Sequence, residues 1–218
     1  MRLKSLRSQH VAIWCRIAAG IGAVSAGVLA GCATAARAAT IDDLTVRKVG
    51  DRYLVELHAQ LDARSSAAYA VFADLANLPA INTDVRHIEI ESRAGANPVE
   101  LGTVIRACVL FYCRSIRESQ RMTFVRRPDG GDVYASVLPG GDLRSGRARW
   151  LFRDSGGRTD LRVTAELQPA FLIPPLIGPW VVKRWLRAET IQSSANIEKL
   201  AAASVRSTRE RTRYRPDP

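Results

Sequence analysis

The chain has 218 residues, of which 47% are hydrophobic, and this content is enough for one globular domain with additional segments. Its formal net charge of +11 could indicate a nucleic-acid partner. The first 31 residues, however, contribute four basic and no acidic side chains, and the rest of the excess is dispersed. We therefore expect no nucleic-acid binding and favour an anionic membrane surface as the partner.

The N-terminal segment has the pattern of a secretory signal. A basic stretch precedes an uncharged run of Ala, Gly, Ile, Val and Leu that is too short and too rich in Gly for a stable membrane span. The run ends in LAGC (29–32), which resembles the bacterial lipoprotein box and predicts a signal over residues 1–31 with lipidation at Cys32. The alternative is an ordinary secretory signal over 1–38 that ends in Ala-Arg-Ala. Both readings place the mature protein in the periplasm of the bacterial cell envelope, and the first attaches it by lipid to the outer membrane.

The four cysteines divide into two groups. Cys15 and Cys32 belong to the signal region, which leaves Cys108 and Cys113 as an even pair in an oxidising compartment. We interpret this pair as a disulfide across a hairpin. Free thiols and a metal site are the alternatives, although the sequence offers no His or further Cys nearby, and we predict neither a metal nor a cofactor.

The first part of the mature chain predicts one strand and two short helices. Residues 32–43 are a linker of small residues, and apolar side chains then alternate over 44–61 with the period of a half-buried strand. Residues 65–75 carry an apolar stripe at helical spacing, and Ser65 can cap this helix. Pro79 marks the start of a second short helix.

Six antiparallel strands and one long helix follow. Turns rich in Gly, Pro, Asp and Asn separate the segments with β-type alternation. The predicted strands cover residues 85–93, 101–108, 113–125, 132–138, 143–152 and 159–168, and the helix covers residues 181–203. The Arg-rich residues 204–218 are predicted to be a disordered tail.

The stretch YAVFADLANLPAIN (69–82) resembles a signature of the START-like superfamily, also called SRPBCC or Bet v 1-like, which includes the polyketide cyclase/dehydrase branch. With the order of elements, the resemblance covers residues 44–203. It implies an α+β helix-grip fold, in which a curved antiparallel sheet of about seven strands wraps on a long C-terminal helix and two short helices follow the first strand. It indicates function less specifically than fold, because this fold hosts lipid carriers, cyclases and hydrolases.

Two apolar segments are expected at one end of this fold. Successive turns of an up-and-down sheet alternate between its ends, so the hairpin tip after Cys108 and the link before the last helix share an end. The resemblance implies that this end is the mouth of a cavity, and exposed apolar patches mark membrane, ligand or partner surfaces. The predicted mouth residues are Val109, Leu110, Phe111, Tyr112, Phe171, Leu172, Ile173, Leu176, Ile177 and Trp180.

Basic residues are expected around the same end, and they would suit anionic lipid head groups. They are Arg114, Lys183, Arg184 and Arg187. Two alternatives remain open at this point. The apolar tips could pack on each other and close the end without a cavity mouth, and the charges could form an ordinary solvated rim.

Polar residues fall on faces that are expected to point inward. If Cys108 pairs with Cys113, then Thr103 lies opposite Glu118, and Glu118 and Gln120 are on the concave face of the sheet. A dry core would not hold them, because each unpaired buried polar group costs about 1–3 kcal/mol. The predicted cavity-lining residues are Ile105, Ile116, Glu118, Gln120, Met122, Trp150, Val182, Leu186, Thr190, Ser193 and Ile197. A structural pair between Glu118 and an inward Arg, or a register shifted by one residue, are the alternatives.

No nucleophile motif or phosphate-binding loop is present in the sequence, and His58 and His87 are expected on the outside. The only candidates for acid–base catalysis are Glu118 and Glu189. We therefore expect a module that binds or transfers a hydrophobic small molecule or lipid, such as an isoprenoid or quinone, at a membrane surface. A cyclase- or hydrolase-type enzyme that uses Glu118 or Glu189 is the first alternative. An envelope module with a protein partner, which the sequence does not identify, is the second.

Overall fold

The structure, a computed structural model, describes residues 39–93, 95–109, 112–174, 176 and 178–213, with the backbone alone for residues 112 and 208–213. The predicted signal segment, the LAGC motif with Cys32 and the Ala-Arg-Ala site therefore lie outside the described residues. Within the described part, no helix combines the length and the hydropathy that a membrane span requires.

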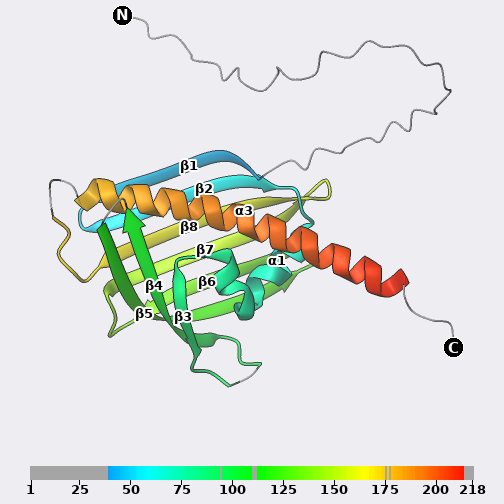
Figure 1. The fold of residues 1–218 in the computed structure, drawn as a ribbon, viewed down its shortest axis with the longest axis horizontal. Coiled ribbons are helices and arrows are strands. Elements are labelled where there is room, and N and C mark those ends of the chain that lie inside the picture. The colour runs from blue at the N-terminus through cyan, green and yellow to red at the C-terminus, as the bar shows by residue number, and fades with distance from the viewer. Residues whose placement is uncertain (1–38, 94, 110–111, 175, 177, 214–218) are drawn as a thin grey trace, which may run out of the picture. The chain divides into compact units, whose positions relative to one another are not determined.

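One antiparallel sheet of eight strands, in the order β1-β2-β8-β7-β6-β5-β4-β3, forms the body of the fold (Figure 1). The strands are β1 (Thr40–Val49), β2 (Arg52–Leu61), β3 (Val85–Ile90), β4 (Val99–Val109), β5 (Tyr112–Arg127), β6 (Gly130–Leu138), β7 (Leu143–Ser155) and β8 (Arg158–Pro169). The helices are α1 (Ser65–Ala73), the 3-10 turn η1 (Leu75–Asn77), α2 (Leu78–Ile81) and α3 (Gly178–Arg213).

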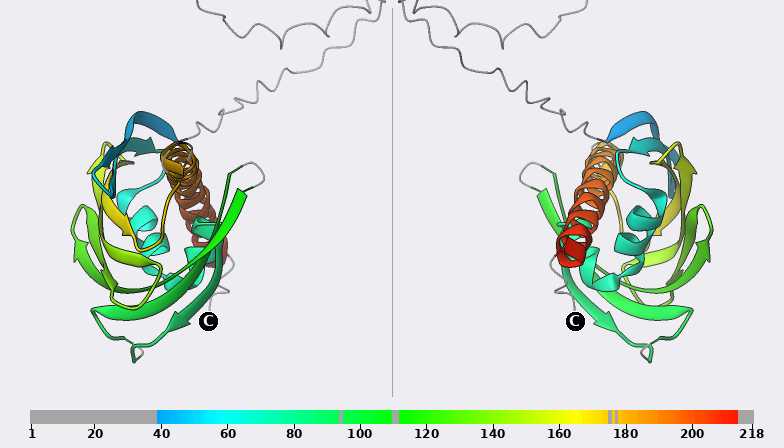
Figure 2. Two further views of the ribbon diagram at one scale, coloured as in Figure 1. Left: turned by 90° about the vertical axis from the view of Figure 1, so that its left-hand side faces the viewer. Right: turned by 90° about the vertical axis from the view of Figure 1, so that its right-hand side faces the viewer.

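The strands curve around the helices, and the long helix α3 lies across the open side of the sheet (Figure 2). Each pair of neighbouring strands is antiparallel, and each strand from β3 to β7 pairs with the next one along the chain. This arrangement confirms the predicted α+β helix-grip fold. The sheet has eight strands instead of about seven because the first predicted strand is in fact two strands, β1 and β2.

The predicted single strand over residues 44–61 was wrong, because a hairpin divides it. The chain turns at Gly50, whose φ of +61° is a left-handed conformation that glycine adopts without strain. The structure also places the start of β1 at Thr40, inside the predicted linker 32–43. The sequence carries a signal for the hairpin that the prediction missed. Leu44, the buried residue of β1, is at an even-numbered position, whereas the buried residues of β2, from Tyr53 to Leu61, are at odd-numbered ones.

The last helix is longer than predicted at both ends. It begins at Gly178 instead of 181 and continues to Arg213, so residues 204–213 are helical and were wrongly assigned to a disordered tail. Up to Ser207, where the description of side chains ends, Ala201 is the last fully buried residue of this helix. Beyond it the helix extends past the sheet (Figure 1). Arg and Glu are good helix formers, and adding residues to an existing helix costs little compared with nucleation.

The two ends of the space between sheet and helices are filled differently. Around α1 the interior is densely packed: the Phe72 ring lies 5.0 Å from Trp150 and 5.5 Å from Phe152, measured between centroids. Ser65, predicted as the cap of this helix, is its first helical residue and makes no capping hydrogen bond. Gly131 allows close packing here, because a Cβ at that position would lie 2.3 Å from the Tyr69 ring. Away from α1, the side chains leave a space.

Candidate ligand cavity

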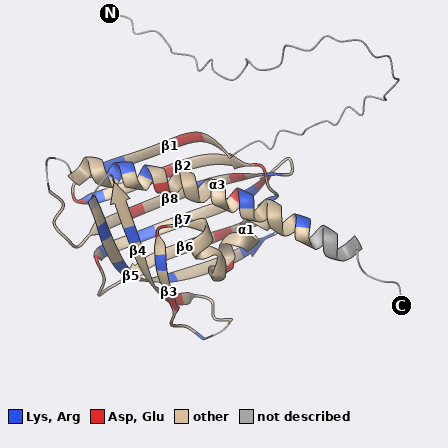
Figure 3. Ribbon diagram, viewed as in Figure 1, with Lys and Arg blue, Asp and Glu red and all other residues tan. Residues whose placement is uncertain are grey.

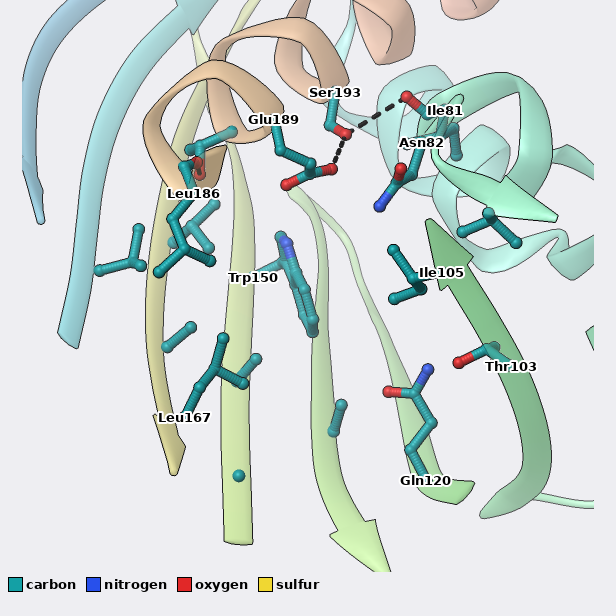
Figure 4. A pocket seen from close by; sticks show the side chains of 18 of the residues that line it. Ile81, Asn82, Thr103, Ile105, Gln120, Trp150, Leu167, Leu186, Glu189 and Ser193 are labelled. Carbon is teal, nitrogen blue, oxygen red and sulfur yellow. Dashed lines mark hydrogen bonds between the residues drawn. The ribbon is translucent and has the colours of Figure 1, made fainter. Parts of the chain in front are cut away.

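A cavity of about 230 Å³ lies between the concave face of the sheet and α3. Its walls come from all strands except β1, from Phe72 of α1, from α2 and the segment that follows it, and from one face of α3 (Figure 4). Apolar side chains predominate, and a few polar groups from the sheet and the helix converge on the same space. This composition is typical of small-molecule sites.

The space exists because small residues form its floor. Ala135 of β6 lies opposite Ala148 of β7, which lies opposite Ala165 of β8, so that three methyl groups run side by side across the sheet. Gly146 adjoins this row and cannot be enlarged without displacement, since its Cβ would come within 2.7 Å of Val137. Side chains of this size do not reach α3, and the gap is therefore not closed by the protein itself.

The register of the β4–β5 hairpin is the one that the cysteine pair predicts. Cys108 lies opposite Cys113, and Thr103 lies opposite Glu118. A disulfide joins the two cysteines, whose Cα atoms are 4.1 Å apart, on the outer face of the sheet. The predicted disulfide is thus confirmed, and the shifted register is excluded.

The wall of the cavity includes ten of the eleven residues that the sequence indicated, and the eleventh, Val182, lines a smaller pocket beside it. Asn82 and Trp185 also line the cavity and were missed. Trp185 precedes Leu186 and lies four positions before Glu189, a helical spacing that could have identified it. Asn82 is the last residue of the family-like stretch, and its position depends on how α2 packs on α3.

Glu118 lies on the sheet side of the cavity. The hydroxyl group of Thr103 donates a hydrogen bond of 3.3 Å to its Oε1 atom. Burial raises the pKa of Glu118, and the hydrogen bond from Thr103 opposes this effect only in part. Among the described residues no basic group forms an ion pair with Glu118, so the alternative of a structural pair with an inward Arg was wrong.

Glu189 lies on the helix side. Its Oε1 atom is 2.5 Å from the Ser193 hydroxyl, which is also 3.2 Å from the carbonyl oxygen of Ile81 (Figure 4). Burial raises the pKa of Glu189, and the negative charge of Asp84 raises it further. Asp84 itself accepts a hydrogen bond of 2.8 Å from the indole of Trp185. These bonds join the segment after α2 to α3 at the edge of the cavity.

Three further polar groups line the cavity without a hydrogen-bond partner among the described residues. They are the side-chain amide of Gln120, the Nδ2 atom of Asn82 and the indole nitrogen of Trp150. In Figure 4 this nitrogen is at the end of the Trp150 ring that points toward Glu189. These groups can therefore bind water or a ligand.

The end of β4 and the apolar link lie at the same end of the fold. A pocket of about 70 Å³ there is lined by Val109 of β4, by Phe171 of the link and by the first turns of α3. The Arg114 guanidinium carbon lies 3.7 Å from the centre of the Phe171 ring. This pocket shares Ile116, Leu143, Leu167, Trp185 and Leu186 with the larger cavity, so the two hollows adjoin.

The predicted mouth residues differ in their surroundings. Val109 is buried and Ile173 packs against the core, so part of this end is closed as in the alternative without a mouth. Leu172, Leu176 and Trp180 are exposed, with relative accessibilities of 89%, 94% and 54%. Leu110, Phe111, Ile177 and the side chain of Tyr112 lie outside the described residues.

The basic residues near this end also have different roles. Arg114 lies 3.6 Å from Asp142, and Arg187 donates a hydrogen bond of 3.1 Å to the carbonyl oxygen of Leu44. Arg184 lies 5.8 Å from the centre of the exposed Trp180 ring and is itself exposed. Basic residues are visible on the first half of α3 and on the neighbouring β4 and β5 in Figure 3.

The two histidines of the described part lie away from the cavity. His58 is on the outer face of β2, with Nε2 at 3.2 Å from Asp160 and Nδ1 at 3.7 Å from Asp42. His87 is exposed on β3. Neither side chain lines the cavity, as expected for solvated histidines.

The model of one protein family, described as polyketide cyclase / dehydrase and lipid transport, matches residues 61–192, which include most of the cavity wall. The chain belongs to this family. The resemblance to the START-like superfamily is thereby confirmed. A comparison with curated protein sequences finds no match.

Several solved structures have the same fold as this member of the polyketide cyclase and lipid transport family. Their sequences are only distantly similar to it. The ZhuI aromatase/cyclase from Streptomyces sp. R1128 is 14% identical, with a TM-score of 0.60 over 72% of this chain and 98% of that one. A STAR-related lipid transfer protein from Xanthomonas axonopodis is 14% identical, with a TM-score of 0.52 over 73% and 99%. The human StarD13 lipid transfer and protein localization domain is 15% identical, with a TM-score of 0.52 over 71% and 83%. These similarities show the fold alone.

Proposed function

We propose that this protein binds and transfers a hydrophobic molecule, such as a lipid, isoprenoid or quinone, in the bacterial cell envelope. The observation that carries the proposal is the unfilled space between the alanine floor of the sheet and α3, which adjoins a pocket at the apolar end of the fold. A protein that served only as a rigid scaffold would gain stability by filling this space, because cavities reduce packing energy.

The size of the hollow favours a small ligand or one chain of a larger one. The main cavity of about 230 Å³ exceeds the ~150 Å³ that suffices for a benzene molecule in an engineered cavity. It is smaller than most drug-sized sites, which range from about 300 to 1,000 Å³. The adjoining pocket of about 70 Å³ extends it toward the mouth. A single apolar chain or a one- or two-ring compound therefore suits this space.

The exposed residues at the mouth support contact with a membrane. Leu172 and Leu176 would each gain on the order of 1.5–3 kcal/mol from full burial in an apolar phase. Trp180 has the amphipathic ring that favours the interface between lipid and water, and Arg184 beside it would attract anionic head groups. We propose that this end faces the bilayer while the ligand enters or leaves.

The proposed location has support from two features of the sequence. The N-terminal pattern predicts export, with lipidation at Cys32 or cleavage after Ala38. The Cys108–Cys113 disulfide is of the kind that persists in oxidising compartments. A lipid anchor at Cys32 would attach the protein to the outer membrane.

The function is tested on protein extracted from membranes of a host that processes lipoproteins. Native mass spectrometry reports N-terminal acylation and any bound small molecule together, and organic extracts identify that molecule. We expect an apolar compound in the native protein. Its absence, together with failure of delipidated protein to bind N-phenyl-1-naphthylamine, a neutral fluorescent probe, would overturn the proposal.

The membrane-facing role needs a separate test. Leu172→Ser combined with Leu176→Ser should weaken flotation with anionic vesicles by at least about fivefold, since both side chains leave the apolar phase. Ile90 and Ile191 are exposed elsewhere, so the double variant Ile90→Ser and Ile191→Ser is the matched control. Equal flotation of the two variants would contradict this orientation.

One observation favours catalysis as a second function. Glu118 and Glu189 line the same cavity, and burial raises the pKa of both carboxyl groups, as is common for general acids and bases. If the protein is a cyclase- or hydrolase-type enzyme, a variant with Gln at both positions should be inactive. Unreacted substrate should then remain bound in its cavity. The compound that copurifies with that variant would then differ in mass from the one in the native protein. Identical compounds would leave only the binding function.

A further inference from the structure

The charged groups whose side chains face into the main cavity are both acidic. Glu118 faces it from β5 and Glu189 from α3. Arg147 of β7 is the only basic residue among the lining residues of the described chain, but its guanidinium binds Glu166 at 2.6 Å on the outer face, where its side chain is 79% exposed. Asp84, whose negative charge acts on Glu189, is also acidic and already accepts the Trp185 hydrogen bond.

This arrangement determines which ligand groups the interior can accept. An anionic group would be desolvated between two carboxyl groups with no counter-cation, which is unfavourable whether or not those groups are ionised. A hydroxyl or amino group instead donates a hydrogen bond to the carboxylate form. A hydroxyl group can also accept one from the protonated form. A donor group on the ligand therefore fits both states of Glu118 and Glu189.

Other polar groups on the same walls also lack hydrogen-bond partners that a polar ligand atom could supply. The amide of Gln120 and the Nδ2 atom of Asn82 lack partners among the described residues. In the adjoining pocket, Tyr53 is 1% exposed, and its hydroxyl group has no hydrogen-bond partner among the described residues. Arg114, the basic residue that lines this smaller pocket, is paired with Asp142 and lies against the Phe171 ring, outside the main cavity. A purely alkyl ligand would leave these groups unsatisfied, at a cost of about 1–3 kcal/mol for each fully buried one.

We propose that the ligand carries a hydrogen-bond donor, an alcoholic, phenolic or amino group, which lies between Glu118 and Glu189, and that the cavity excludes free carboxylates and phosphates. The inference rests on the proposed binding function and adds the chemical class of the ligand to it. Among hydrophobic molecules it selects hydroxylated or amino compounds and rejects fatty acids.

The preference for a hydrogen-bond donor is tested by displacing bound N-phenyl-1-naphthylamine with octylamine, 1-octanol or octanoate at pH 7. The three competitors share one chain length and differ only in the terminal group. We expect the amine and the alcohol to displace the probe at concentrations at least about tenfold lower than octanoate, which corresponds to one satisfied hydrogen bond. Octanoate as effective as octanol would overturn the inference while leaving the binding function intact. Failure of the probe itself to bind would instead overturn the binding function.

Substitutions of the two cavity acids test whether they cause the preference for donor groups over carboxylates. In the double variant Glu118→Gln and Glu189→Gln, octylamine should lose about tenfold in apparent affinity and octanoate should gain, because the cavity loses both acidic groups. Glu89 and Glu91 are exposed, so the variant Glu89→Gln and Glu91→Gln makes the same change of charge outside the cavity and should retain the native order. If this control shifts the order equally, or the cavity variant does not shift it, the inference is wrong. The order of the competitors on the native protein tests it even if the cavity variant does not fold.

Discussion

Thr103 and Glu118 face each other across the β4–β5 hairpin, and the threonine hydroxyl donates the only hydrogen bond that the Glu118 carboxyl group receives from the described residues. A carboxyl group in this environment is stabilised in its neutral form, because one weak hydrogen bond does not replace the water it has lost. Burial also raises the pKa of Glu189 on α3, although the hydrogen bond from Ser193 opposes this effect. These two acids are therefore costly for folding, and this cost is consistent with the ligand-binding role that we propose for the cavity.

The first prediction concerns the pH dependence of stability. Burial raises the folded-state pKa of Glu118 and of Glu189 above the unfolded value, so the folded protein binds more protons, and these groups reduce stability as the pH rises above about 4.3. The double Gln variant should therefore unfold at a higher urea concentration than the native protein at pH 7. The difference should disappear at pH 4 and below.

Urea titrations at both pH values measure this effect, and the Glu89→Gln and Glu91→Gln variant controls for the change in net charge. If the double Gln variant of the cavity were less stable than the native protein at pH 7, the two acids would be structural instead.

The second prediction concerns the alanine floor. Ala148→Leu places a larger side chain in the space under α3. We expect binding of N-phenyl-1-naphthylamine to fall by at least about tenfold without loss of stability, because the new side chain fills a void. Ala201→Leu is the matched control. Ala201 is fully buried in a packed part of the core, so the same enlargement should cost about 1–3 kcal/mol.

Thermal unfolding and probe titration of the two alanine variants give both quantities. A loss of stability at position 148 as large as that at position 201 would show that the cavity is filled in solution.

The third prediction concerns an ion-pair cluster away from the cavity. Asp132 is fully buried, and it binds Arg127 at 2.8 Å and Arg153 at 2.5 Å. Burial alone would raise the pKa of Asp132, but the hydrogen bonds from Arg153 and Arg127 outweigh it and hold the pKa below its ordinary value. Asp132→Ala leaves two guanidinium groups without this partner and should cost about 3–5 kcal/mol at pH 7.

The sign of the pH effect is opposite to that of the cavity acids. A lowered folded-state pKa contributes stability that is present above the unfolded value of about 3.9 and is lost as the pH falls through the folded value. Acid unfolding followed by circular dichroism should therefore show a shallower loss of stability below pH 4 in Asp132→Asn than in the native protein. A parallel decline in both proteins would contradict the assignment.

The fourth prediction concerns the disulfide. Cys108 and Cys113 are five positions apart, so the bond closes a short loop and should contribute about 2 kcal/mol to stability. Replacement of both by Ser, or treatment with a reductant, should lower the free energy of unfolding by that amount. Reductant should have no further effect on the double Ser variant, and urea titrations with and without reductant measure both results. A native protein that is insensitive to complete reduction would show that the bond does not stabilise the fold.

Local patterns in the sequence predicted the strands well. In β4 and β5, the period of two and the cysteine pair were sufficient to orient every side chain, because a strand has only two faces and one cross-strand pair determines the rest. The hairpin at Gly50 was predictable from the change of phase in the buried positions. It was missed because the alternation on either side looked continuous. The end of α3 was misjudged because a composition typical of disorder also favours extension of an existing helix.

The sequence by itself determined which side chains face inward and which cysteines can pair, because periodicity and cross-strand pairing act over a few residues. Only the tertiary structure decided that Ala135, Ala148 and Ala165 lie in one row beneath α3, and that Asn82 and Glu189 line one space. It also decided that no basic side chain among the described residues faces the two acids. A cavity is the difference between the volume enclosed by distant elements and the volume of the side chains inside it, so it becomes defined only once the helix is packed on the sheet.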